Sequence, residues 1–275
     1  MYDEVGISVI MGVHNPRSHI RFFEAVESIL QQSRTDWELL ICDDGSSAPS
    51  ERLIRRAARK DKRIRYWRID ENRGLAHALN VCIQQARGRY IARMDDDDIS
   101  KPDRLEKQAG FLDTHRRFQW VGSNAELVDE KGVWGFQKMP EMPQTQDFLF
   151  NSPYIHPTVM FRRDVLLRHG GYNESPRLNL CEDYELFMRL HRQGERGYNL
   201  QDPLLQYWEN DESYRKRTFR RRIREMKLRY RGFKDLGILE ASTIPYVLKP
   251  LLAGAIPAPV HHYINRRIKR HEEVL

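Results

Sequence analysis

Residues 90–98 read Tyr-Ile-Ala-Arg-Met-Asp-Asp-Asp-Asp, so an apolar run leads directly into four adjacent carboxylates. The run over residues 90–94 predicts a short buried strand, because strands covered on both faces are apolar along their whole length. Neighbouring carboxylates repel one another and are tolerated where water or a shared cation compensates their charge. The junction between the strand and the acids is therefore the first candidate for a functional site.

Three similar runs precede this stretch, and helical patterns separate them. The predicted strands cover residues 7–11, 37–42, 64–69 and 90–94. Ser18 can cap the first helix, residues 51–60 and 75–86 form the next two, and Pro102 lies at the first turn of a fourth. Strands that alternate with helices predict a parallel sheet with covering helices, which is an α/β fold.

Polar sequence follows three of the four predicted strands at the point where each strand ends. His14 and Asn15 follow the first strand, Asp43 and Asp44 the second, and residues 95–98 the fourth. Ligands bind outside the carboxyl ends of parallel strands, so we expect these groups to line one pocket. An Asp can accept from a nucleotide base or a ribose hydroxyl, although Asp, Gly and Ser are also the commonest turn residues.

The acids at positions 95–98 suit a hard divalent cation. Mg²⁺ and Mn²⁺ take oxygen ligands and bridge carboxylates to substrate phosphates. The alternative is a solvated acidic loop before a helix, where negative charge is favourable. The position after a buried strand, where the other loops converge, favours the metal or nucleotide role.

The region of residues 118–210 is less regular and predicts an α+β half that completes the pocket. Glu182 and Asp183 open a predicted helix, where a carboxylate could be a general base for an alcohol or could only favour the helix N-terminus. His156 is a candidate metal ligand or phosphate contact, although a lone histidine is more often structural. Arg73, in an Asn-Arg-Gly turn, could meet a diphosphate.

The basic character of the chain lies in its C-terminal part. The 275 residues carry a net charge of +7, and residues 211–275 alone contain 16 Lys/Arg against 7 Asp/Glu. This pattern predicts an anionic lipid surface or nucleic acid as partner. Residues 244–260 are largely apolar but contain four prolines, which disfavours a spanning helix and favours a segment at a membrane interface. Alternatively, residues 215–231 form a helix packed on the body with a solvated basic face.

The composition is that of a soluble globular protein. Apolar residues make up 40% and charged residues 31% of the chain, which argues against wholesale disorder, collagen and a multi-span membrane protein. The cysteines, Cys42, Cys82 and Cys181, have no metal-site spacing and are expected to be reduced and buried in a cytoplasmic protein. The N-terminus has acids where a signal peptide needs positive charge.

Taken together, six segments resemble a family 2 glycosyltransferase of the GT-A fold. They are ISVIMGVHN (7–15), WELLICDDGSS (37–47), ENRGLAHALN (71–80), GRYIARMDDDDISKPDRLEKQ (88–108), HPTVMFRRDVL (156–166) and CEDYELFMRL (181–190). The resemblance implies a Rossmann-like, mostly parallel sheet flanked by helices in a domain of residues 1–210. Its nucleotide-binding half ends at about residue 125, its acceptor half covers about 118–210, and a basic helical tail covers 211–275.

The resemblance also implies roles for the acids after the fourth strand and for one histidine. The DxD motif of the family falls on Asp95, Asp96 and Asp97. Asp97 is the better candidate for the direct metal ligand, with Asp95 and Asp96 near the ribose and diphosphate and Asp95 a second ligand candidate. His156 matches the HP segment of the family and is the third metal-ligand candidate.

Other positions match family residues that contact the nucleotide or take the acceptor's proton. The carboxylate that binds the base corresponds to Asp43 or Asp44, and the loop of residues 14–15 lies along the nucleotide. The catalytic base of the family's ED motif falls on Asp183, with Glu182 beside it.

The implied reaction moves a sugar from a nucleotide-diphosphate sugar, most commonly a UDP-sugar, to a hydroxyl of a saccharide acceptor with Mn²⁺ or Mg²⁺. Direct displacement with one base inverts the anomeric carbon. Processive members carry a QxxRW motif and several membrane spans, and this sequence has neither, so a single transfer is expected. The basic tail suggests a lipid-linked acceptor at the inner face of the cytoplasmic membrane, in cell-surface polysaccharide or lipopolysaccharide synthesis.

Three other activities compete with this interpretation. A sugar-phosphate nucleotidylyltransferase needs a glycine-rich phosphate loop after the first strand, and HNPRSH (14–19) has no glycine. An aspartyl phosphatase needs its DxD motif after the first strand, not the fourth. A nucleic-acid-binding protein that acts through the tail leaves the acidic pocket unexplained, so nucleic acid is the less favoured partner.

Overall fold

The computed structural model describes residues 5–178, 180–209, 218–255, 266, 267 and 269. The first half contains β1 (Ile7–Val13), α1 (His19–Leu30), β2 (Trp37–Asp44), α2 (Ala48–Ala58), β3 (Ile64–Ile69), α3 (Leu75–Gln85) and β4 (Tyr90–Arg93). The second half contains β5 (Ile99–Ser100), α4 (Arg104–Thr114), β6 (Trp120–Asp129), β7 (Gly132–Gln137), β8 (Met160–Arg162), α5 (Arg163–Arg168), α6 (Glu182–Arg192) and β9 (Gly197–Trp208). The C-terminal helices are α8 (Phe219–Asp235) and α9 (Ile244–Leu252).

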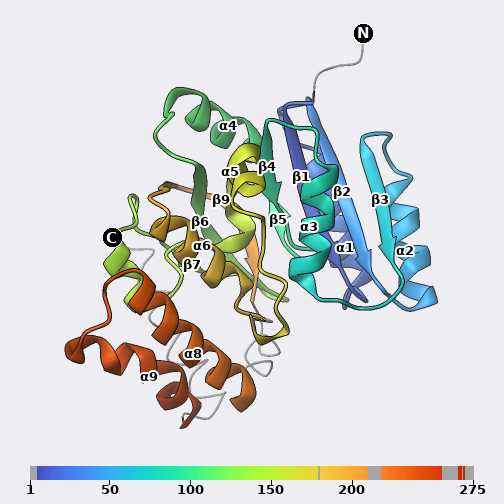
Figure 1. Cartoon of the computed structure of the whole chain (residues 1–275). Coiled ribbons are helices and arrows are strands. Elements are labelled where there is room, and N and C mark those ends of the chain that lie inside the picture. The colour runs from blue at the N-terminus through green and yellow to red at the C-terminus, as the bar shows by residue number, and fades with distance from the viewer. Residues whose placement is uncertain (1–4, 179, 210–217, 256–265, 268, 270–275) are drawn as a thin grey trace.

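The first four strands form a parallel block in the order β3-β2-β1-β4 (Figure 1). Ile10 of β1 is aligned with Leu40 of β2 and with Arg93 of β4, so the carboxyl ends of these strands lie along one edge. Beyond β4 the sheet continues through β8, β6, β9 and β5, where β8 and β5 are antiparallel to their neighbours. Most of the paired residues belong to parallel ladders, and the predicted α/β class is confirmed.

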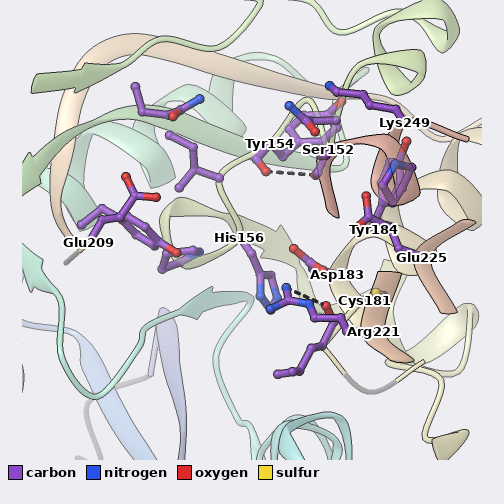
Figure 2. A pocket seen from close by; sticks show the side chains of 18 of the residues that line it. Ser152, Tyr154, His156, Cys181, Asp183, Tyr184, Glu209, Arg221, Glu225 and Lys249 are labelled. Carbon is purple, nitrogen blue, oxygen red and sulfur yellow. Dashed lines mark hydrogen bonds between the residues drawn. The ribbon is translucent and has the colours of Figure 1, made fainter. Parts of the chain in front are cut away.

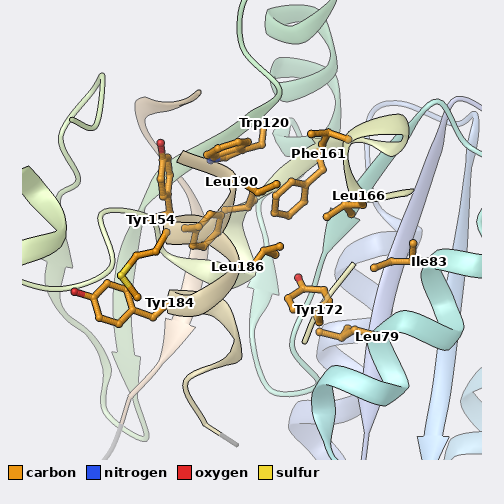
Figure 3. Close-up of a cluster of buried hydrophobic side chains, with 14 of the residues drawn as sticks. Leu79, Ile83, Trp120, Tyr154, Phe161, Leu166, Tyr172, Tyr184, Leu186 and Leu190 are labelled. Carbon is orange, nitrogen blue, oxygen red and sulfur yellow. The ribbon is translucent and has the colours of Figure 1, made fainter. Parts of the chain in front are cut away.

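Alternate residues of each strand face opposite sides of the parallel block, because successive side chains of a strand point to opposite faces of the sheet. Ile10, Leu40 and Cys42 face α3 in one buried cluster, whereas Val9 and Leu39 face α1 and α2 in a second cluster. Burial on both faces explains why these strands are continuously apolar. Figure 3 shows the first cluster, which extends from Leu79 and Ile83 of α3, where Tyr172 lies beside Leu79, to Trp120 and Tyr154 at its other side.

The observed ends of several helices and strands differ from the predicted ends by a few residues. Ser18 caps α1 by accepting from the backbone N–H of Arg21, as expected. Strand β2 extends to Asp44, because Asp43 and Asp44 remain paired with β3. Helix α4 begins at Arg104, two residues beyond the proline expected in its first turn.

The C-terminal helices share their core with the body. Helix α8 contacts α6 and α9, and its buried residues Leu228 and Phe233 belong to the same cluster as Phe148 and Tyr184. Arg229 is fully buried and donates to the carbonyls of Leu149 and Phe150. In the parts that the structure describes, no helix combines the length and apolar character needed to cross a bilayer.

Candidate active site

The loops after β1 and β2 are tied together at the carboxyl edge of the sheet. The Asn15 carboxamide oxygen accepts from the backbone N–H and the hydroxyl of Ser47, each at 2.9 Å. The Asn15 backbone N–H donates to the Ser46 hydroxyl at 2.9 Å. Asn15 has a φ of 48°, a conformation that asparagine tolerates better than most residues, and it is exposed together with His14. Two predicted nucleotide-contacting residues therefore lie at the expected edge.

Asp43 and Asp44 are buried, and their carboxylate oxygens accept hydrogen bonds from other groups of the protein. Asp43 accepts from the Ser46 backbone N–H at 2.9 Å, the Tyr66 hydroxyl at 3.0 Å and the Arg68 guanidinium at 2.8 Å. The two Asp44 oxygens accept, each at 2.8 Å, from the backbone N–H groups of Arg73 and the following Gly74. These carboxylates hold the loops at the edge of the sheet.

Arg73 lies on the turn that Asp44 holds. Its side chain is exposed and pairs weakly with Glu174 at 3.9 Å. A long, exposed guanidinium at this edge can reach a ligand, so its predicted diphosphate contact stays a prediction.

An acidic cluster follows β4. Candidate ligand atoms of Asp95, Asp97 and Asp98 all lie within 4.8 Å of one another. Two of these residues were predicted from the DxD motif, but Asp98 was not. Asp98 is 1% exposed, and one of its oxygens accepts from the Trp208 backbone N–H at 2.8 Å. Its other oxygen, Oδ2, has no hydrogen-bond partner among the described residues.

These residues fit a divalent cation. Burial, with the charges of Asp95 and Asp97, raises the pKa of Asp98 well above its usual range. Burial and the charges of Asp97 and Asp95 also raise the pKa of Asp96 to about 8. A shared hard cation would give the buried Oδ2 a partner and would reduce the repulsion between the carboxylates. Oxygen is the preferred ligand of such a cation.

Arg93, which sequence reasoning missed, interacts electrostatically both with this cluster and with Glu182 and Asp183. It is 3% exposed and forms an ion pair with Asp95. Its Nε and Nη1 have no partner among the described residues. The detectable signal was a charged residue within an otherwise apolar strand, because buried arginines are rare unless paired.

His156 does not join the acidic cluster. It opens a 3-10 turn (His156–Thr158), is buried, and its Nε2 lies 2.6 Å from the Tyr172 hydroxyl. Burial, with a smaller effect of Arg93, lowers the pKa of His156 well below its usual range, so it is neutral. The described contacts of this ring are those of a hydrogen-bonded core histidine, and its role as a ligand stays a prediction.

Glu182 and Asp183 form the first turn of α6, as predicted. Burial, followed by the charge of Asp183, raises the pKa of Glu182 to about 7. Burial also raises the pKa of Asp183, and the cations of Arg93 and Arg221 oppose that rise. A partly desolvated carboxylate with a raised pKa is a suitable general base for a hydroxyl.

A cavity of about 490 Å³ opens beside Asp183 (Figure 2). Its walls include the segment from Asn151 to Pro157, the start of α6, one face of α8 and the end of α9. Its volume is in the range of small-molecule sites. Asp183 and His156 both line it, so the candidate base faces a space large enough for part of an acceptor.

A parallel α/β block with an acidic cluster at its carboxyl edge, and a second carboxylate pair at the start of a helix in the other half of the chain, is the arrangement of GT-A glycosyltransferases. The profile of Glycosyl transferase family 2 matches residues 8–170, and the chain therefore belongs to that family.

EpsE of Bacillus subtilis (strain 168) is 37% identical over 271 residues, which cover 98% of this chain and 96% of EpsE. The O-antigen biosynthesis glycosyltransferase WbnJ of Escherichia coli is 32% identical over 219 residues, covering 76% of this chain and 82% of WbnJ. Among solved structures, S. aureus TarS (1–349) in complex with UDP is similar with a TM-score of 0.65 at 21% identity. It covers 90% of this chain and 70% of the TarS chain. This similarity confirms the GT-A fold.

Proposed function

We propose that this glycosyltransferase is metal-dependent and inverting, and that it transfers a sugar from a nucleotide-diphosphate sugar to a saccharide hydroxyl in cell-surface polysaccharide synthesis. The observation that carries the proposal is the cluster of Asp95, Asp97 and Asp98 at the carboxyl edge of the parallel block. The similarity to WbnJ supports the pathway class, and the UDP complex of TarS supports UDP as the donor nucleotide.

Asp97 and Asp95 would hold Mn²⁺ or Mg²⁺, with Asp98 as a further ligand. Such a cation supplies charge neutralisation for the departing diphosphate. Asp43 and Asp44 fix loops that would border the nucleotide, and any contact between them and the base is a prediction.

Asp183 would take the proton of the acceptor hydroxyl. It lines the cavity where an acceptor can enter, and the raised pKa brings its basicity closer to neutral pH. Direct attack with one base inverts the anomeric carbon, so an α-linked nucleotide sugar would give a β-linkage.

A thermal-shift experiment tests the proposal. UDP with Mn²⁺ should raise the Tm of the full chain by about 5 °C at a hundredfold excess over Kd, because a ligand that binds only the folded state stabilises it. UDP alone, Mn²⁺ alone and a DNA oligonucleotide are the comparison arms, and GDP and dTDP test the nucleotide. A shift produced by DNA but not by UDP with Mn²⁺ would contradict the proposal.

We also propose that the exposed face of the C-terminal helices contacts an anionic membrane that carries a lipid-linked acceptor. On α9, Ile244, Leu248 and Leu252 follow a four-residue spacing and are 38%, 40% and 65% exposed. On α8, the exposed Phe219 is accompanied by exposed Arg220, Arg224 and Lys227. Apolar residues next to cations suit the interface of an anionic bilayer, which would place the enzyme on the inner face of the cytoplasmic membrane.

The triple variant Arg220→Gln/Arg224→Gln/Lys227→Gln should lower partitioning onto phosphatidylglycerol-containing vesicles at least tenfold, because each exposed cation contributes to binding. Sedimentation with vesicles measures this. Arg52→Gln/Arg59→Gln, a similar charge change on exposed positions of the α2 region, should sediment like the wild type. Equal sedimentation of the triple variant and the wild type would rule the membrane contact out.

A further inference from the structure

The carboxyl end of β9 connects the acidic cluster to the cavity beside Asp183. The Trp208 backbone N–H donates to Asp98 at 2.8 Å. The residues on either side of Trp208, which are Tyr207 and Glu209, both line the cavity. Successive side chains of an extended chain point to opposite faces, so these two residues face the same space. Three consecutive residues therefore border both the candidate cation site and the cavity.

Tyr207 and Trp208 are fixed on the two faces of this strand. The Arg21 guanidinium lies over the Trp208 ring, 3.5 Å from its centroid. The Tyr207 ring packs against the buried cluster that includes Ile155 and Leu205. The backbone of both residues is paired with β6. The fold itself therefore sets the position of the Tyr207 ring before any ligand binds.

The Tyr207 hydroxyl is available to a ligand. The residue is half-buried, and in the described part of the chain its hydroxyl makes no hydrogen bond. Burial, followed by the charges of Asp98 and Asp95, raises the pKa of Tyr207 well above its usual range, so the hydroxyl stays protonated. A protonated phenol can donate one hydrogen bond and accept others.

Tyr207 and Asp183 belong to different walls of the cavity. Figure 2 shows Glu209, which shares the wall of Tyr207, and Asp183 on opposite sides of His156. In a direct displacement, the anomeric carbon lies between the departing diphosphate and the attacking hydroxyl. The proposed function puts the diphosphate at the acidic cluster and the attacking hydroxyl beside Asp183. A residue that borders both the cluster and the cavity is then next to the transferred sugar.

We propose that the Tyr207 hydroxyl donates a hydrogen bond to a hydroxyl of the transferred sugar and thereby contributes to the choice of donor. The inference rests on the proposed function, because it takes the diphosphate of the donor to lie at the acidic cluster. A site that hydrogen-bonds a substrate hydroxyl discriminates against an analogue that lacks this hydroxyl. Tyr207 is therefore a binding and specificity residue in addition to the candidate cation ligands and base.

The Tyr207→Phe variant of the full chain tests this contact, because it keeps the ring and removes only the hydroxyl. Calorimetry with Mn²⁺ and without acceptor gives Kd for UDP, UDP-glucose, UDP-galactose and UDP-N-acetylglucosamine. The nucleotide sugar that the wild type binds most tightly is the donor probe. Its Kd should rise about fivefold in the variant, as expected for the loss of one hydrogen bond. Kd for UDP should stay within twofold.

Tyr198→Phe, on the same strand, is the matched control. The Tyr198 hydroxyl donates to the Glu141 carboxylate, and neither residue lines the cavity. This variant should bind both UDP and the donor probe within twofold of the wild type. An equal loss of donor affinity in the control would overturn the inference, because the effect would then belong to the strand as a whole.

Analogues of the donor probe that each lack one sugar hydroxyl identify the contact. The analogue without the contacted hydroxyl should bind the wild type about as weakly as the parent donor binds Tyr207→Phe. It should also lose no further affinity in that variant, because the two changes remove the same interaction. If the losses are additive for every analogue, the hydroxyl does not contact the sugar and the inference is wrong.

The failure of this inference is distinguishable from the failure of the proposed function. An unchanged Kd for the donor probe in Tyr207→Phe would overturn the inference, whereas binding of UDP with Mn²⁺ by the wild type would still support the function. A loss of UDP binding in the variant would assign the hydroxyl to the nucleotide or the cation and would overturn the inference as well. A wild type that does not bind UDP with Mn²⁺ would contradict the proposed donor itself.

Discussion

Replacing Asp183 by Asn should lower kcat about 10²- to 10⁴-fold while leaving donor binding nearly unchanged. The substitution keeps the size of the side chain but removes the group that would accept the acceptor's proton, and general-base catalysis contributes an effect of this size. Asp183 lines the cavity and is outside the acidic cluster, so the nucleotide should still bind. Steady-state transfer rates and the Tm shift with UDP and Mn²⁺ measure the two effects. A near-normal kcat would remove Asp183 from this role.

The pH dependence separates Asp183 from its neighbour. A base must be deprotonated, so kcat should fall as the pH drops through the raised pKa of Asp183. Burial, followed by the charge of Asp183, raises the pKa of Glu182 to about 7, so an acidic limb set by Glu182 would be centred near that pH. If Asp183 is the base, the Glu182→Gln variant should retain the acidic limb of the kcat–pH profile. If Glu182 were the base, the limb would be centred near pH 7 and Glu182→Gln would lose turnover instead.

Asp97→Ala should reduce sugar transfer about a thousandfold at low Mn²⁺, because it removes one of the three clustered carboxylates and with it several kcal/mol of charge stabilisation. The Mn²⁺ concentration that gives half-maximal activity should rise, and the Tm shift produced by UDP with Mn²⁺ should shrink. Titration of activity with Mn²⁺ checks the prediction. Unchanged Mn²⁺ dependence would show that the cluster does not hold the catalytic cation.

The matched control for this variant is Asp103→Ala. Asp103 lies shortly after the cluster in the sequence and pairs at the surface with Lys107 at 2.9 Å. Exposed pairs of this kind contribute little to stability, so this variant should keep both its activity and its Mn²⁺ dependence.

The parallel half of the fold was predictable because its signals are local. Strand β3 has the predicted bounds, and β1, β2 and β4 differ from the prediction by one or two residues at their carboxyl ends. Their apolar runs are buried on both faces, and the helices between them have their own periodicity. The second half was less predictable. Strand β6 pairs with β9 in parallel and with β7 and β8 antiparallel, and such long-range pairing has no signature in either segment.

The candidate site also contains residues that local sequence predicted and residues that only tertiary contacts brought together. The acids at positions 95–98 were predicted to suit a cation because they directly follow a buried strand, whereas the clustering of Asp98 with Asp95 and Asp97, and its hydrogen bond to Trp208 of β9, appear only in the structure. His156 is paired with Tyr172, a partner that the sequence could not indicate. The contribution of α8 to the cavity was also unreadable, since a basic helix has the same sequence whether it faces solvent or a ligand.

The sequence alone determined a parallel α/β block with acids at its carboxyl edge, because strand burial and helix periodicity are patterns of residues close together in sequence. Only the tertiary structure decided which carboxylates share a site, which histidine is already engaged and which arginines of the tail line a cavity. Those choices depend on distances between segments far apart in sequence, which packing fixes and local pattern does not.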